Sequence, residues 1–180
     1  MKSLALVTFM ALASAASLAS AQESHRELNA HEHGVSTIEI AIEGERIALN
    51  VQSPGADIVG FEYMAEKEAD KSAVESAILR FTRTHELFVF DSPAGCRVAE
   101  VFVHLQGGEH DHEESGERAG HTEFHASYVF ECSHPDALVA IEFPFFDVFP
   151  NVLEIEAQIV TESGASAAEI GRDVPRLSLR

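Results

Sequence analysis

The feature that most constrains the fold is a strict alternation of apolar and polar side chains, which returns several times along the chain. Ile38, Ile40 and Ile42 alternate with polar neighbours, and after a turn at Gly44 the alternation resumes over residues 47–51. A period of two is typical of strands with one buried face, and two such runs joined by a tight turn predict a β-hairpin.

The same alternation governs residues 121–130, which are rich in β-branched and aromatic side chains and therefore favour a strand. One face of this strand would be apolar and the other would carry polar and ionisable groups. The apolar face holds Phe124, Ala126, Tyr128 and Phe130, and the polar face holds His121, Glu123, His125 and Ser127.

Residues 66–84 predict the one main helix, because Val74, Ala77, Ile78 and Phe81 recur at helical spacing. Together with the strands, this predicts an α+β fold, a largely antiparallel β-sheet domain with the helix packed on it. Shorter runs at 87–90, 101–105, 139–146, 153–160 and 177–179 are further strand candidates, whereas 163–168 is small and polar. Residues 106–120, rich in glycine, histidine and acids, predict a flexible loop.

Residues 1–21 have the pattern of a cleaved signal peptide: Lys2, an apolar stretch and the small residues 19–21. We therefore expect residues 22–180 to form a single exported metal-binding domain, periplasmic in a bacterium and without membrane insertion. The formal net charge of −18 becomes −19 once Lys2 is removed. Such an acidic chain repels nucleic acid and anionic lipid, so neither is an expected partner.

Cys96 and Cys132 are the two cysteines of the chain. In an oxidising compartment an even number of cysteines favours a disulfide. The alternative is a pair of thiolate metal ligands, which a disulfide would exclude.

Histidine placement predicts the function. His31 and His33 share one face if the chain is extended there, and His121 and His125 share a face on either a strand or a helix. Imidazole is the commonest metal ligand, and two such pairs side by side would supply a closed tetrahedral shell suited to zinc. These four histidines are the primary candidate ligands.

A secondary candidate group surrounds the 106–120 loop. Its members are His104, His110, Asp111, His112 and Glu123. Ordering a glycine-rich loop around an ion costs roughly 1–2 kcal/mol of backbone entropy per residue, so we expect weak and exchangeable binding there.

Two alternatives stand beside a zinc-capturing protein. One is a secreted zinc-dependent hydrolase, in which Glu123 would act as the base and the metal would keep an open position. The other is a structural or interaction domain stapled by zinc. Because no G-x-S-x-G, P-loop, G-x-G-x-x-G or H-E-x-x-H motif appears, we expect no enzyme.

Several stretches, in order along nearly the whole exported chain, resemble the ZrgA-type family of bacterial periplasmic zinc-responsive proteins. They are residues 31–37 (HEHGVST), 53–62 (SPGADIVGFE), 94–96 (AGC), 121–126 (HTEFHA), 149–151 (FPN) and 175–179 (PRLSL). The resemblance implies a periplasmic zinc-binding component associated with a zinc uptake system in the inner or outer membrane, and it implies His31, His33, His121 and His125 as ligands. Family members often carry a longer His/Asp/Glu-rich insertion than residues 110–114 provide here.

Overall fold

The predicted hairpin is present in the computed structural model, which describes residues 32–107 and 121–179. Strands β1 (Val35–Glu43) and β2 (Arg46–Pro54) pair antiparallel, with Ile40 opposite Leu49. Both of these side chains are buried, so the hairpin turns its apolar face inward as the alternation predicts.

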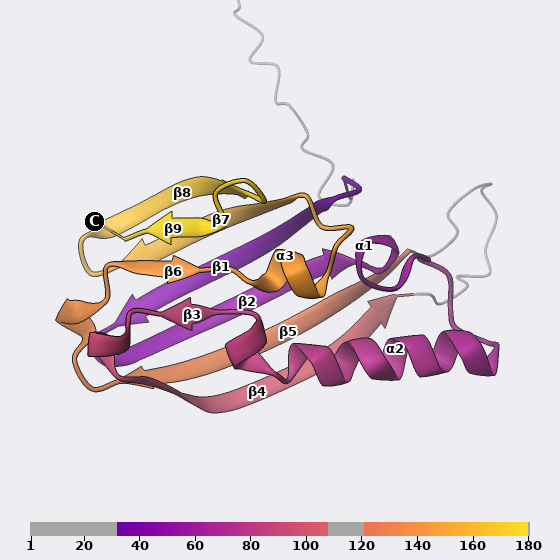
Figure 1. The fold of residues 1–180 in the computed structure, drawn as a ribbon, viewed down its shortest axis with the longest axis horizontal. Coiled ribbons are helices and arrows are strands. Elements are labelled where there is room, and N and C mark those ends of the chain that lie inside the picture. Colours follow the sequence, from indigo (N-terminus) through magenta and orange to yellow (C-terminus); the bar gives the residue numbers. More distant parts are fainter. Residues whose placement is uncertain (1–31, 108–120, 180) are drawn as a thin grey trace, which may run out of the picture. The chain divides into compact units, whose positions relative to one another are not determined.

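The hairpin lies at the centre of a six-stranded sheet with the order β4-β5-β2-β1-β7-β8 (Figure 1). Its other strands are β4 (Cys96–Gly107), β5 (Thr122–Cys132), β7 (Glu154–Thr161) and β8 (Gly164–Gly171). Strands β1 and β7 run parallel, and the other neighbours pair antiparallel. This confirms the predicted α+β class with a largely antiparallel sheet.

A second layer covers one face of the large sheet (Figure 1). The main helix, α2 (Glu68–Phe81), lies within the predicted range 66–84. The rest of the layer consists of α1 (Gly55–Val59), α3 (Phe145–Val148), a small sheet of β3 (Val89–Phe90), β6 (Ala140–Glu142) and β9 (Arg176–Ser178), and single turns at Thr84–Glu86, Ser92–Ala94 and Pro135–Ala137.

Aromatic side chains fill the space between the layers. Phe81, at the end of α2, packs its ring 5.7 Å from Phe124 and 4.6 Å from Phe149, measured between ring centroids. The hydroxyl of Tyr128 donates a hydrogen bond of 3.0 Å to the carbonyl of Phe81, and burial raises the pKa of this phenol. The core therefore fixes the end of α2 on β5.

Two local elements differ in extent from what the sequence pattern indicates. The run 139–146 forms a strand only over Ala140–Glu142, because Pro144 cannot donate to a ladder and α3 begins directly after it. Of the small and polar run 163–168, for which no strand was predicted, residues 164–168 lie within β8, an outer strand that pairs with β7. Small side chains give no apolar alternation, yet the backbone groups of β8 still complete the ladder.

The two faces of β5 differ in the way the sequence predicts. Phe124, Ala126 and Tyr128 are buried under the second layer, whereas Glu123 and His125 are half-buried on the opposite, outer face.

Among the described residues, none of the helices is both long and apolar enough to cross a membrane.

Candidate metal centre

A tight turn places His33 at the start of β1. Gly34 has a φ of +87°, a conformation that suits glycine, and its N–H donates 2.8 Å to Oδ2 of Asp57. The carbonyl of Gly34 accepts hydrogen bonds from the N–H groups of Leu153 and Glu154, at 2.8 and 3.0 Å. The backbone next to His33 is therefore fixed from two directions.

A second segment, which follows α1, brings Glu62 to the same end of the sheet. The N–H of Thr122 donates to the carbonyl of Glu62 over 2.9 Å, which sets this segment beside the start of β5. Gly55 permits this close approach: a Cβ there would lie 2.7 Å from the carbonyl oxygen of Phe61 and closer still to Oγ1 of Thr122.

The carboxylate of Glu62 lies between two imidazoles. Its Oε2 accepts a hydrogen bond from Nδ1 of His121, and its Oε1 lies 3.7 Å from Nδ1 of His33. The side chain of Glu62 is 12% exposed, against 68% for His33 and 58% for His121. Oε1 is buried and, among the described residues, has no hydrogen-bond partner. We call His33, Glu62 and His121 the Glu62 cluster.

Asp57 adds negative charge next to the cluster. Burial raises the pKa of this carboxyl, and the nearby charge of Glu62 raises it further. The hydrogen bond from Gly34 and the charge of His33 act in the opposite direction. Two carboxylates thus lie near His33, so this end of the sheet favours a cation.

A separate group lies on the outer face of the sheet. His104 on β4 and His125 on β5 are directly opposite in the antiparallel ladder, with ring centroids 5.3 Å apart. Nε2–H of His125 donates to Oε2 of Glu123 over 2.6 Å. Nδ1 of His104 is buried and has no hydrogen-bond partner in the described part of the chain. We call His104 and His125 the β4–β5 pair.

The structure brings together some of the predicted ligands and separates others. His33 and His121 both contact Glu62, whereas His125 contacts Glu123 and faces His104. On a strand, four residues span about 13 Å, so His121 and His125 are too far apart to share one ion directly. Within residues 32–107 and 121–179, no three His, Cys, Asp or Glu side chains are arranged as a ready metal-binding group.

Four predicted ligands, His31, His110, Asp111 and His112, lie outside the described residues, as does most of the predicted loop. Whether His31, His33, His121 and His125 bind metal stays a prediction.

The histidine spacing missed Glu62 and Asp57. Both belong to the stretch at residues 53–62 that carries part of the family resemblance. The two carboxylates of that stretch, one in its middle and one at its end, were an available signal. Their significance depends on contacts with His33 and His121, which are distant in sequence.

The predicted disulfide between Cys96 and Cys132 is confirmed. The two residues are partners in the β4–β5 ladder, 36 positions apart in sequence. A disulfide sulfur is not a thiolate, so the alternative of two cysteine metal ligands is excluded while the bond is intact.

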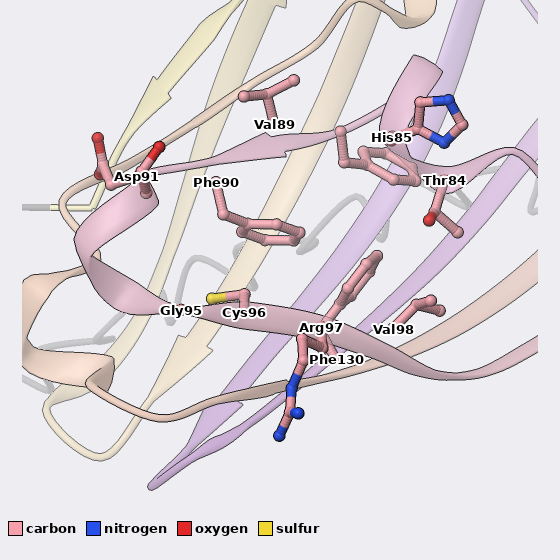
Figure 2. A pocket seen from close by; sticks show the side chains of 12 residues that line it. Thr84, His85, Val89, Phe90, Asp91, Gly95, Cys96, Arg97, Val98 and Phe130 are labelled. Carbon is pink, nitrogen blue, oxygen red and sulfur yellow. The ribbon is translucent and has the colours of Figure 1, made fainter.

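A hollow of about 660 Å³ lies near the disulfide, between β3 and β4 (Figure 2). Its wall is largely apolar, with Phe90 and Phe130 facing the space. Asp91 on its edge accepts hydrogen bonds from the N–H groups of Val139 and Ala140, so it has a structural role. No residue of the Glu62 cluster or the β4–β5 pair lines this hollow.

The fold and these groups define an α+β protein whose large sheet carries imidazole–carboxylate contacts at one end and on its outer face. The chain belongs to the ZrgA family of zinc uptake proteins, whose sequence pattern matches residues 30–179. This confirms the resemblance and gives the protein a role in zinc uptake, within a family of uptake proteins and not of enzymes. A search of curated proteins found no match.

Proposed function

We propose that this protein binds zinc in the periplasm and supports its uptake by a membrane transport system. Membership of a zinc uptake family supports this role. The position of the carboxylate of Glu62 is the main support for locating the site here. One of its oxygens is buried and has no hydrogen-bond partner among the described residues, and the carboxylate lies between two exposed imidazoles.

The donor set of the Glu62 cluster suits zinc. Two imidazole nitrogens and one carboxylate oxygen are ligands that zinc accepts, and a fourth donor completes a tetrahedral site. His31, two residues before His33, is the predicted fourth ligand from the sequence. A site closed by four protein ligands retains its ion and leaves no position for a reacting water, which argues against an enzyme.

Zinc would take the place of the proton in the contact between His121 and Glu62, so that both side chains bind the ion. A neutral imidazole would then carry its proton on Nε2, and an imidazolium would in addition release one proton to water. Ligands must be deprotonated to bind a metal, so binding releases protons and weakens in acid. Acidification therefore provides a route for releasing zinc to a transport component.

The alternative roles have less support. The hydrolase would need Glu123 beside an open metal position, yet its carboxylate accepts a hydrogen bond from His125. A domain merely stapled by zinc would unfold without it. Here a disulfide joins β4 to β5 within the large sheet, and an extensive aromatic and aliphatic core lies between the two layers. No residue of the Glu62 cluster belongs to that core.

The test is a zinc titration in competition with a chelator of known affinity, using protein purified from cells that express the full chain. His33→Ala, Glu62→Gln and His121→Ala should each weaken the tightest binding by more than about 100-fold. His85→Ala is the matched control, because the side chain of His85 is 81% exposed and its ion-pair contact is with Glu86. Unchanged tight binding in all three variants would show that the Glu62 cluster is not the site.

A further inference from the structure

A second arrangement of imidazoles lies outside the Glu62 cluster, on the outer face of the large sheet. His104 and His125 come from adjacent strands and lie directly opposite each other, so the ladder itself sets their separation. Directly opposite residues have Cβ atoms about 4.5–5.5 Å apart, a spacing at which two side chains interact. The ring centroids are 5.3 Å apart.

A neighbouring carboxylate sets the tautomer of His125. Its Nε2–H donates to Glu123, and the Glu123 side chain is 17% exposed. A carboxylate that accepts from one ring nitrogen fixes the tautomer and leaves the other nitrogen with its lone pair, as occurs behind metal-bound histidines. In His125 the nitrogen with the lone pair is therefore Nδ1.

His104 supplies the independent observation. Its Nδ1 is buried and, within the described residues, makes no hydrogen bond, which is unusual for a buried polar nitrogen. The ring of Phe102 lies 5.2 Å from that of His104 on the same strand, measured between centroids, and helps to hold it in place. The ring of His104 thus has a nitrogen that is available to bind a metal ion, because no hydrogen bond within the described residues occupies it.

We propose that His104 and His125 form a second, exchangeable binding site for a divalent transition-metal ion such as zinc, and that Glu123 orients His125 without binding the ion. Two protein ligands leave the remaining coordination positions to water or to an incoming group. Binding at this site is consequently weaker and faster to exchange than at a site closed by four protein ligands.

His125 comes four residues after His121, which corresponds to about 13 Å along a strand, so the second site lies about that far from the Glu62 cluster. This places an exchangeable ion near the Glu62 cluster and on the exposed face of the sheet. Its use in passing zinc onward rests on the proposed function, whereas the binding itself does not.

The experiment is a zinc titration of the full-chain product, followed by competition with chelators of different strengths and by NMR of the histidine ring nitrogens. We expect a tight ion and a weaker one. His104→Ala and His125→Ala should each abolish the weaker binding and leave the tight binding unchanged, and His33→Ala should do the reverse. The control His85→Ala should affect neither.

Glu123 is tested as a positioning residue. Before zinc is added, the NMR spectrum should show His125 with its proton on Nε2, and zinc should shift its Nδ1. Glu123→Ala should allow the other tautomer and weaken the second ion by about 10- to 100-fold, the usual cost of losing such a partner. Glu123→Gln keeps a hydrogen-bond acceptor and should restore part of the affinity.

The outcomes separate this inference from the proposed function. If a weaker ion is absent, or persists in both His104→Ala and His125→Ala, the second site is refuted while the Glu62 cluster can still stand. If zinc binding survives His33→Ala and is lost in His104→Ala, the second site stands and the proposed cluster is wrong. If zinc does not bind at all, both are wrong.

Discussion

The Glu62 cluster contains an imidazole N–H that donates to a glutamate, and the β4–β5 pair makes the same kind of contact through His125 and the neighbouring Glu123, but the two groups are built in different ways. The cluster joins three segments, those of His33, Glu62 and His121, through turns and backbone hydrogen bonds. The pair follows from the register of two adjacent strands. A substitution that disturbs the pairing of β4 with β5 should therefore affect the β4–β5 pair more than the Glu62 cluster. A substitution that disturbs the turns should do the opposite.

The position of the carboxylate also differs. In the cluster, Oε1 of Glu62 lies towards a second imidazole and has no hydrogen-bond partner among the described residues, so Glu62 is placed as a ligand. In the pair, Glu123 contacts His125, and the second imidazole faces the ring of His125. The same chemical group is therefore a ligand in one region and an orienting partner in the other.

Removing the disulfide should have the largest effect. Cys96→Ser combined with Cys132→Ser should lower the free energy of unfolding by roughly 3–4 kcal/mol, because the bond closes a loop across 36 positions. Urea unfolding, with and without reductant for the unmodified protein, measures this. Because the bond lies within the β4–β5 ladder, the affinity of the weaker site for zinc should fall, whereas the affinity of the tight site should change little. Equal losses would mean that the two groups do not differ in their dependence on the ladder.

Replacing the central carboxylate should come next. Glu62→Gln should weaken the tight ion by more than about 100-fold, because even the loss of an outer partner costs 10- to 100-fold in metal affinity. Glu123→Gln is the matched change in the other region and should have a much smaller effect on its ion. Chelator competition gives both values, and equal effects would contradict the assignment of different roles to the two glutamates.

Gly107→Ala should disturb one region and spare the other. Gly107 has a φ of +88°, and a Cβ there would press on the carbonyl oxygen of His121. The substitution should cost roughly 1–3 kcal/mol of stability, typical of a side chain forced into this conformation. We expect weaker tight binding and an unchanged NMR signature for His125. A changed NMR signal of His125 without any loss of tight zinc binding would mean that Gly107 supports the β4–β5 pair and not the Glu62 cluster.

Asp57→Asn should have the smallest effect, and its sign depends on pH. Burial raises the pKa of Asp57 above the ordinary value of 3.8. Its stabilising contribution is therefore present below that value and is lost as the pH rises through the raised pKa of the folded state. At neutral pH, Asp57→Asn should raise the free energy of unfolding slightly, and it should flatten the loss of stability between acid and neutral pH.

Urea unfolding at several pH values, in the presence of a chelator, tests this. The same variant removes a negative charge near His33, so the tight ion should bind somewhat more weakly and the weaker ion should be unaffected. A steeper pH dependence in the variant would show that the carboxylate is stabilised, not strained, in the folded protein.

Local patterns were sufficient for much of the fold. Alternating isoleucines predict β1, and the spacing of Val74, Ala77, Ile78 and Phe81 predicts α2, because each pattern reports directly which side of an element is buried. β8 could not be predicted this way, since alanine and serine do not distinguish a buried face from an exposed one.

The site was less predictable than the fold. His33 and His121 could be selected because imidazoles bind metals, and their contact with one carboxylate depends on a hydrogen bond between Thr122 and Glu62, residues far apart in sequence. The spacing of His121 and His125 permitted a helix or a strand. Only the strand separates them, which is why a four-histidine shell could be proposed from the sequence but is not assembled among the described residues.

The parallel pairing of β1 with β7 has a consequence for the order of events in synthesis. Residues 35–42 pair with residues 154–161, and the carbonyl of Gly34 is held by Leu153 and Glu154. The N-terminus leads both in synthesis and in the proposed export, so the turn beside His33 must wait until residues 153 and 154 have followed before it acquires these partners. Contacts between such distant residues also form slowly. The cluster is therefore among the last parts of the molecule to mature, and a truncated or incompletely folded chain would contain the histidines but lack the fixed turn that aligns them with Glu62.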